Sequence, residues 1–309
     1  MWRSGGVGWR EGSAVLRWWG GRVSPVAYGR GLTFRAVGGR ACAGVRGNAC
    51  PVAAEVPGRS TGGLCPECAR LDRAHSVAAD TFADDPRPYR VYLAWFGRGT
   101  VKVGITGEHR GSARLLEQGA VAFCWLGRGP LMAARRTEEV LRQALGVPDR
   151  VSYDRKRALR IDLPDSAARA AEIEELYGRA LGVGGWGETL EALPFAAHDH
   201  GEAFGLGGLP ALDGTVTELV DGGVVTGRVL AAAGPDLHLL DPGGRHLALD
   251  GRLLGGVGAG AGRGRRRLER AGGRRTGAGS RRPGRTVLIV KSWIPLPTAV
   301  DSARPVRRG

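Results

Sequence analysis

Apolar and polar residues form their clearest pattern between residues 89 and 146. Two apolar runs, Val91–Phe96 and Val101–Ile105, lie on either side of the turn Gly97-Arg98-Gly99, which is typical of a β-hairpin. A short helix over 112–118, a strand over 121–126 and a longer helix over 130–145 are predicted to follow. This part of the chain therefore predicts a β-β-α-β-α unit.

Shorter apolar clusters flank this unit on both sides. Residues 14–19 and 32–37 are separated by glycine-rich sequence and predict short strands. Residues 165–181 have the apolar spacing of a helix, and four further short strands are predicted over 216–219, 224–230, 237–240 and 246–249. From Gly255 onward the chain is rich in Gly and Arg, which predicts a disordered basic tail. An apolar island over 287–294 interrupts that tail, and the pattern assigns it no structure.

Four of the five cysteines form a cluster with the spacing Cys42-x7-Cys50-x14-Cys65-x2-Cys68. Two cysteines separated by two residues bring both sulfurs onto one ion, and four thiolates form the closed tetrahedral shell of a structural zinc site. Three alternatives stay open: a redox Cys-x-x-Cys pair, unrelated buried thiols, or His75 as a ligand in place of one cysteine.

These patterns predict an α+β protein with an N-terminal β and zinc-cluster region. Its six segments are short Gly-rich strands (1–41), a four-cysteine zinc site (42–68), a linker (69–88), the β-β-α-β-α unit (89–160), a helix with a small all-β unit (161–254) and a low-complexity basic tail (255–309). The fifth cysteine, Cys124, lies in an apolar strand and is predicted to be a core residue.

The net charge of +15 is unevenly distributed along the chain. Residues 87–160 hold 15 basic and 6 acidic residues, residues 161–262 hold 5 and 15, and residues 263–309 hold 14 and 2. A basic folded segment indicates an anionic partner, which we expect to be DNA or RNA. The sequence shows neither a secretory signal nor an apolar stretch of the roughly 18 residues that span a bilayer, so we expect a cytoplasmic protein without a membrane partner. Nothing in it indicates an oligomeric state.

Four features of the central unit occur in a recognisable order: Val91-Tyr92-Leu93, then Val101 to Thr106, then Arg114, then Glu138. In this order and spacing the unit resembles the GIY-YIG superfamily, and most closely its Lys-Ile-Gly branch. In that superfamily two hairpin strands carry the motifs, one helix carries an arginine and a later helix carries a metal-binding glutamate. The match covers about residues 89–146.

The resemblance implies hydrolysis of phosphodiester bonds in DNA or RNA. Tyr92 would orient or deprotonate the attacking water, and Arg114 would offset the charge that develops on the phosphoryl oxygens. Glu138 would hold a Mg²⁺ or Mn²⁺ ion. Lys102 stands at the position of the second tyrosine and would contact a phosphate as a point charge.

Two departures from the superfamily motifs leave two functions open. Arg90 stands where the first motif opens with glycine, and Lys102 removes the hydroxyl of the second tyrosine. The first function is a magnesium-dependent endonuclease. The second is a catalytically inactive, zinc-containing nucleic-acid-binding protein, whose phosphate contacts would come from Lys102, Arg110, Arg114, Arg135 and Arg136.

Further alternatives concern single residues and the acidic segment. Arg110 is the alternative for the helix arginine, and Glu139 for the glutamate. Glu138 would instead pair with Arg135 or Arg142 if its helix face has no other role. A third function is a scaffold whose acidic residues 161–262 contact a basic partner or the tail.

The chain as a whole is also similar to a family of bacterial proteins of unknown function. The similarity is carried by Arg40 to Gly44, Val101 to Thr106, Glu117 to Ala120 and Asp149 to Val151. Members of that family pair a four-cysteine cluster with a GIY-YIG-like segment and a C-terminal β region. The position of the cysteines just ahead of this segment predicts that the zinc site supports it.

Overall fold

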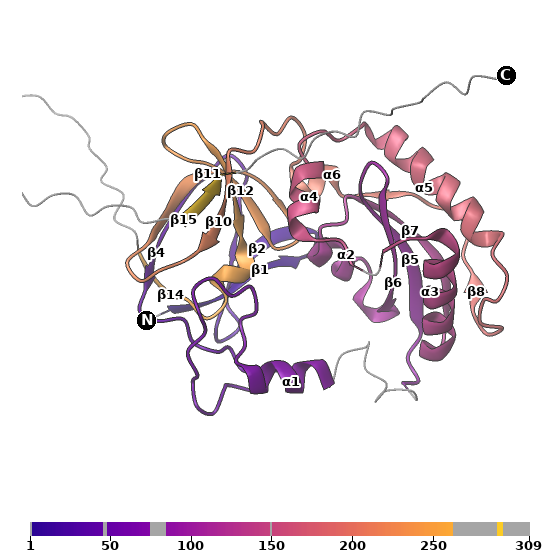
Figure 1. Cartoon of the computed structure of the whole chain (residues 1–309), viewed down its shortest axis with the longest axis horizontal. Helices are drawn as coiled ribbons and strands as arrows, with labels where there is room; N and C mark the ends of the chain where they lie inside the picture. The colour runs from indigo at the N-terminus through magenta and orange to yellow at the C-terminus, as the bar shows by residue number, and fades with distance from the viewer. Residues whose placement is uncertain (1, 46–47, 75–84, 149, 262–288, 293–309) are drawn as a thin grey trace, which may run out of the picture.

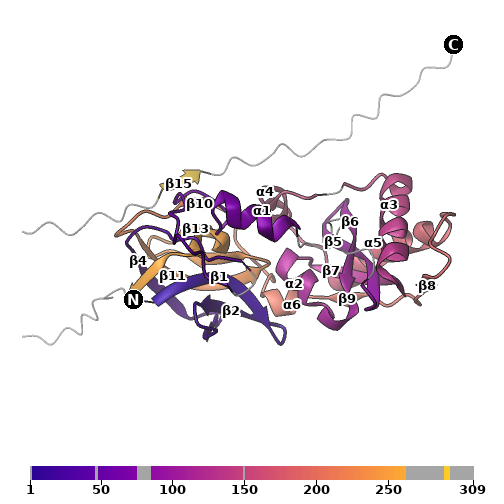
Figure 2. The ribbon, with the colours of Figure 1, turned by 90° about the horizontal axis from the view of Figure 1, so that it is seen from below.

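The computed structural model describes residues 2–45, 48–74, 85–148, 150–261 and 289–292. These residues form two β-sheets and six α-helices, so the α+β class is confirmed. Figure 1 shows the two sheets side by side, and Figure 2 shows α2 (Ala113–Gln118) and α6 (Gly201–Phe204) between them. No helix in the described part of the chain has the length and apolar character needed to cross a bilayer.

The larger sheet joins the two ends of the described chain. Its strands lie in the order β15-β10-β13-β12-β11-β4-β14-β1-β2-β3. They are β1 (Trp2–Arg10), β2 (Ser13–Trp18), β3 (Val23–Pro25), β4 (Gly31–Val37), β10 (Gly214–Glu218), β11 (Val224–Ala233), β12 (Asp236–Leu240), β13 (His246–Asp250), β14 (Gly258–Ala261) and β15 (Ile289–Ser292). Apolar side chains from both the N-terminal and the C-terminal part of the chain form the core of this sheet, among them Leu16, Val229 and Leu249.

The strands on either side of the central unit therefore do not form the separate segments that the sequence suggests. β4 lies between β11 and β14, with Phe34 opposite Val225 and Ala36 opposite Ala259. An alternating apolar pattern shows which face of a strand is buried but not which distant strand is its partner. Only the hairpins, whose strands are joined by short turns, leave a pairing signal in the sequence.

Two strands lie in the segment that the sequence assigns to a low-complexity tail. β14 follows the 3-10 turn Gly251–Leu254 and pairs with both β1 and β4. β15 lies in the apolar island and pairs antiparallel with β10, with Lys291 opposite Thr215. The tail predictions for residues 262–288 and 293–309 fall outside the described residues.

The smaller sheet contains the central unit. Its order is β6-β5-β7-β8, and β9 also pairs with β7. The strands are β5 (Tyr89–Gly97), β6 (Thr100–Gly107), β7 (Ala122–Gly129), β8 (Glu191–Ala192) and β9 (His198–Asp199). With α2 before β7 and α3 (Leu131–Leu145) after it, the predicted order of strand, strand, helix, strand and helix is confirmed. The predicted helix over 165–181 is α5 (Ser166–Leu181).

Side chains of β5 alternate between two faces of the smaller sheet. Val91 and Trp95 pack in one core with Leu141 of α3 and Ile173 of α5. Tyr92 lies on the opposite face, in a second core that includes α2. Figure 1 shows α3 and α5 on the side of this sheet that faces away from the larger sheet.

A helix that the apolar pattern does not predict, α4 (Tyr153–Leu159), connects the two sheets. Arg157 donates hydrogen bonds to Asp236 (2.6 Å) and Asp250 (2.7 Å), and Arg160 donates to Asp236 (2.7 Å). All four side chains are buried. This connection buries paired charges rather than an apolar stripe, which is why hydrophobic periodicity misses it.

The segment predicted as a linker, residues 69–88, begins as a helix. α1 (Pro66–Ala74) starts within the cysteine cluster and continues into that segment. A proline at the first helical position and Glu67 in the first turn both favour a helix start here. Residues 75–84, and with them the alternative ligand His75, lie outside the described residues.

Candidate metal centre and basic site

The four clustered cysteines come together as one buried site. The sulfurs of Cys42, Cys50, Cys65 and Cys68 all lie within 4.8 Å of one another. Thiolates around one zinc ion at 2.3 Å stand about 3.8 Å apart, so this set is close to the required geometry. Cys65 and Cys68 are brought together by the first turn of α1. The site fits a metal such as zinc, and no fifth His, Cys, Asp or Glu joins this group within the described residues.

Backbone N–H groups donate hydrogen bonds to sulfurs of the cluster. Those of Gly44 and Cys65 donate to the Cys42 sulfur at 3.4 and 3.2 Å. Hydrogen bonds from the backbone of Ala54 and Val52 lower the pKa of the Cys50 thiol to about 7. Cys124, by contrast, lies buried in β7, where burial raises the pKa of its thiol to about 12. It is a core residue, as predicted.

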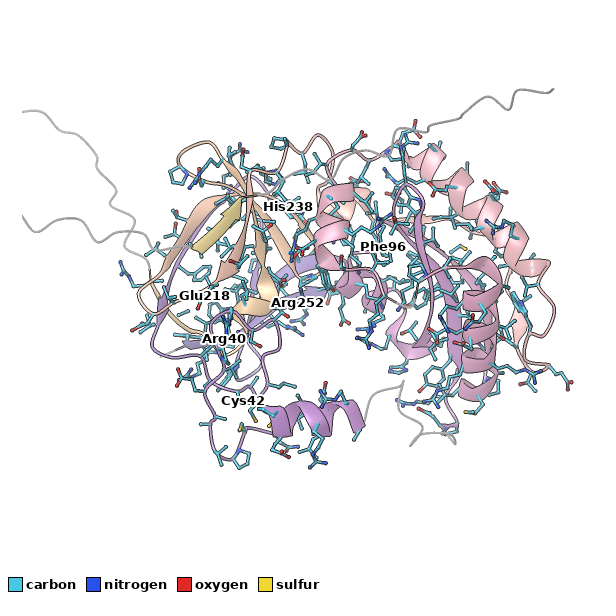
Figure 3. All side chains as sticks on the ribbon, in the orientation of Figure 1. Arg40, Cys42, Phe96, Glu218, His238 and Arg252 are labelled. Atoms are coloured by element: carbon cyan, nitrogen blue, oxygen red, sulfur yellow. The ribbon has the colours of Figure 1, made fainter. Side chains whose placement is uncertain are left out.

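Arg40 anchors the segment that carries the four clustered cysteines to the larger sheet. Its buried guanidinium donates to the carbonyls of Pro57 (2.9 Å), Gly255 (2.7 Å) and Arg252 (2.9 Å), and also to that of Ser60. Figure 3 shows Arg40 beside Cys42, with Phe96 of the smaller sheet well apart from both. The contacts of Arg40 therefore anchor this segment to the larger sheet, whereas the sequence predicts that the metal site supports the central unit.

Tyr92 is the buried centre of a second candidate site. It lies directly opposite Gly104 of β6, and a Cβ atom at position 104 would overlap its hydroxyl group. The Gln118 side chain donates a hydrogen bond to the Tyr92 oxygen at 2.9 Å. Glycine at position 104 and glutamine at position 118 thus position this hydroxyl between β6 and α2.

Charged residues from three helical segments act on Tyr92. Burial is the largest cause of its raised pKa, and the charge of Glu138 raises the pKa further. The charges of Arg114 and Arg110 lower it, as does the hydrogen bond from the glutamine. The structure therefore brings the predicted residues Tyr92, Arg114 and Glu138 into one electrostatic neighbourhood, with Tyr92 as a neutral phenol at pH 7.

The two arginines beside Tyr92 share one carboxylate. Arg110 lies 2.8 Å and Arg114 lies 3.7 Å from Glu117, and all three side chains are more than a third exposed. Exposed pairs of this kind are weak, so the arginines can exchange this contact for an anion. Glu138 is half-buried on α3, and its alternative Glu139 is exposed and lies 2.7 Å from Arg142.

Lys102 and Lys156 add positive charge to the same face. Lys102 lies opposite Ala94 and therefore on the same side of the sheet as Tyr92. Lys156 of α4 is buried, and its ammonium group donates to the Gln118 carbonyl at 2.9 Å. Burial is the largest cause that lowers the pKa of Lys156 to about 7, and the charge of Lys102 contributes.

Lys156 is the residue of this site that the sequence reasoning misses. It lies 4.0 Å from the centre of the Phe96 ring and 4.5 Å from that of Tyr153. The only sequence signal for it is the local excess of basic residues, because α4 has no apolar periodicity.

Arg90, the departure at the first motif, is accommodated without breaking the strand. It pairs in register with Thr106 of β6 and with Arg128 of β7. Its guanidinium lies 2.7 Å from Glu108 and 5.1 Å from the centre of the Trp125 ring. β5 therefore keeps its two neighbours at the position where the superfamily has glycine.

Comparison with known proteins gives one family match. The family model described as "Protein of unknown function (DUF2797)" matches residues 29–256. The chain belongs to this family. The matched region contains the cysteine cluster and every residue of the basic site, from Cys42 to Lys156. No curated protein and no solved structure matches the chain. The predicted membership in a family of unknown function is thus confirmed, and the DUF2797 region covers both candidate sites.

Proposed function

We propose that this protein binds nucleic acid through the basic face of its smaller sheet, which we regard as a GIY-YIG-like unit. The observation that carries the proposal is that Arg110 and Arg114 act on the buried Tyr92 while Lys102 lies on the same face of the sheet. Three side-chain cations on one face can contact several phosphates of a nucleic-acid backbone. Contacts of this kind position the backbone and carry little sequence selectivity.

The carboxylate of Glu117 is part of this arrangement. In the unbound protein it pairs with Arg110 and Arg114 and keeps their guanidinium groups together. A phosphate group offers more acceptor oxygens than the carboxylate and takes bidentate hydrogen bonds from arginine. Binding would therefore transfer the arginines from Glu117 to the phosphate without a large movement of α2.

The test compares binding of labelled single- and double-stranded DNA and RNA by two full-length variants. Lys102→Gln/Arg114→Gln alters the basic face, and Arg70→Gln/Arg245→Gln removes two exposed cations elsewhere while keeping the same net charge. We expect the first variant to lose affinity by about tenfold and the second to bind within about twofold of the wild type. Equal losses in both variants would show that the basic face has no special role.

Phosphodiester hydrolysis is a second candidate function of the same site. It is favoured by Glu138, whose charge reaches Tyr92 and which would hold a hard divalent cation through oxygen. When bound, that cation would polarise the scissile phosphate. Arg114 would stabilise the negative charge on the phosphate, and Tyr92, neutral and held by Gln118, would orient a water molecule.

The neighbouring glutamates supply a matched test of hydrolysis. Glu138→Ala and Glu139→Ala remove equal charge from adjacent positions of α3, and of the two it is Glu138 whose charge raises the pKa of Tyr92. Cleavage in Mg²⁺ or Mn²⁺ that disappears only in Glu138→Ala would support an enzyme. Wild-type protein that binds nucleic acid and leaves it intact would establish the catalytically inactive alternative.

We also propose zinc as the metal of the cysteine cluster. Four thiolates form a soft, closed ligand shell that suits zinc and leaves no position for a substrate. Reduced clustered thiols also fit a cytoplasmic protein. Elemental analysis of the purified chain should find about one zinc ion per molecule. A different transition metal at that stoichiometry would contradict this assignment.

A further inference from the structure

The sheet face that carries Tyr92 continues into an open pocket that the basic site does not use. The pocket has a volume of about 490 Å³, within the range of small-molecule sites. It is lined by Arg90, Gly111, Ser112, Phe123, Trp125, Ala197, His198, Asp199 and His200. These residues come from β5, from β7, from β9 with the residues on either side of it, and from the turn that precedes α2. The pocket therefore lies next to the proposed phosphate site.

Ring faces make up much of the pocket wall. The Trp125 ring packs edge-on against Phe123, with centroids 5.2 Å apart, and against Tyr92 at 6.2 Å. The His198 ring is stacked on Phe123, with centroids 4.7 Å apart and planes inclined by 17°. The wall thus offers aromatic and imidazole surfaces suited to a planar ligand.

The charged groups at the pocket are already paired. Both oxygens of Asp199 accept hydrogen bonds from Arg169, at 2.7 and 2.9 Å. Arg90 is bound to Glu108 and lies over the Trp125 ring. Neither of these two side chains offers an unpaired charge to a ligand. Stacking on the rings is therefore the main interaction that the pocket offers.

His200 supplies a hydrogen-bond acceptor. Its Nδ1 atom lies 2.9 Å from the carbonyl oxygen of Ala120, so Nδ1 must carry the proton and donate. Burial lowers the pKa of His200, which keeps the ring neutral at pH 7. In this tautomer Nε2 has a lone pair that can accept a hydrogen bond. An amino group on the edge of a planar ring would donate such a bond.

We propose that this pocket binds an unpaired nucleobase of a single-stranded nucleic acid, an inference that rests on the proposed function. The base would stack on Trp125 or His198 and donate an exocyclic amino group to His200. Gly111 and Ser112 in the pocket wall directly follow Arg110 and precede Arg114 by two or three residues. The phosphate contacts and part of the base pocket wall therefore lie on one short segment.

A matched pair of variants tests the pocket without changing the basic site. Ala197 is exposed and lines the pocket, so the indole of Ala197→Trp would fill it; the adjacent Ala196 is also exposed but does not line it. The probes are a labelled single-stranded deoxyadenosine oligonucleotide and the same backbone with abasic sites, titrated against the full-length chain.

We expect the wild type and Ala196→Trp to prefer the base-containing strand by about tenfold, the effect of one base–aromatic stack. Ala197→Trp should bind both strands equally. If Ala197→Trp keeps the wild-type preference, the proposal that the pocket binds a base is wrong. The proposal is also wrong if the wild type binds both strands equally well. Failure of the wild type to bind either strand would instead reject the proposed function, and the pocket with it.

Discussion

Lys156 provides the most specific stability prediction, because its charge depends on pH in a range that can be measured. Its ammonium group is buried beside Phe96 and donates to the Gln118 carbonyl. The pKa of Lys156 is about 7 in the folded chain, whereas the solvated side chain of the unfolded chain keeps the ordinary lysine value of 10.5. Between these values the unfolded chain binds a proton that the folded chain does not, so raising the pH stabilises the folded state.

The magnitude follows from that difference in pKa. One pKa unit corresponds to about 1.36 kcal/mol, so the two pH units from 7 to 9 carry at most about 2.7 kcal/mol. The Gln118 carbonyl and the face of the Phe96 ring stabilise the ammonium form and reduce this effect. We therefore expect the wild type to gain about 2 kcal/mol over this range relative to Lys156→Met, whose side chain cannot titrate.

The assay is urea unfolding of both proteins at several pH values from 6 to 9, followed by circular dichroism. The quantity of interest is the difference between their free energies of unfolding, which removes the contribution of every other titrating group. We expect this difference to favour the wild type increasingly as the pH rises above 7. A difference that stays constant across the range would refute the reasoning, because Lys156 would then remain protonated in the folded chain.

Three further predictions concern the metal centre and the tyrosine site. The double replacement Cys65→Ser/Cys68→Ser should abolish metal binding, measured by elemental analysis; full retention of metal would contradict the four-cysteine site. Arg40→Met should lower the free energy of unfolding by about 3 kcal/mol, because it leaves several partly buried carbonyls without a donor. A loss below about 1 kcal/mol would argue against its anchoring role. Gly104→Ala should cost about 1–3 kcal/mol in the same measurement, because its methyl group overlaps a buried tyrosine. Gly184→Ala, where the added methyl group meets nothing within 4 Å, is the control and should be close to neutral.

Local patterns in the sequence predict the β-β-α-β-α part of the smaller sheet well. The hairpin of β5 and β6 and the helices α2 and α3 have strong turn and capping signals close in sequence, such as Gly119 and Gly146 in left-handed conformation at the helix ends. The cysteine site is predictable for a similar reason, since the Cys65–Cys68 spacing alone suggests a shared ion.

Contacts between distant residues are not visible in these patterns. The pairing of β4 with β11 joins residues about 190 apart, for which one sequence offers no register signal. Arg40 and Lys156 look like ordinary basic residues until the fold surrounds them with carbonyls and aromatic rings. The pocket beside Trp125 likewise depends on β9, a strand of two residues that is too short to have a periodic pattern.

The most direct test of the account is the salt dependence of nucleic-acid binding. Each phosphate contact contributes about 0.7 to 0.9 to the slope of log affinity against log salt concentration. If Arg110 and Arg114 each contact a phosphate, the slope for Arg110→Gln/Arg114→Gln should be smaller than that of the wild type by about 1.4 to 1.8. The basic tail is present in both proteins and cancels in this comparison. Binding with an unchanged slope in the double variant would contradict the central claim, because the phosphates would then lie elsewhere on the chain.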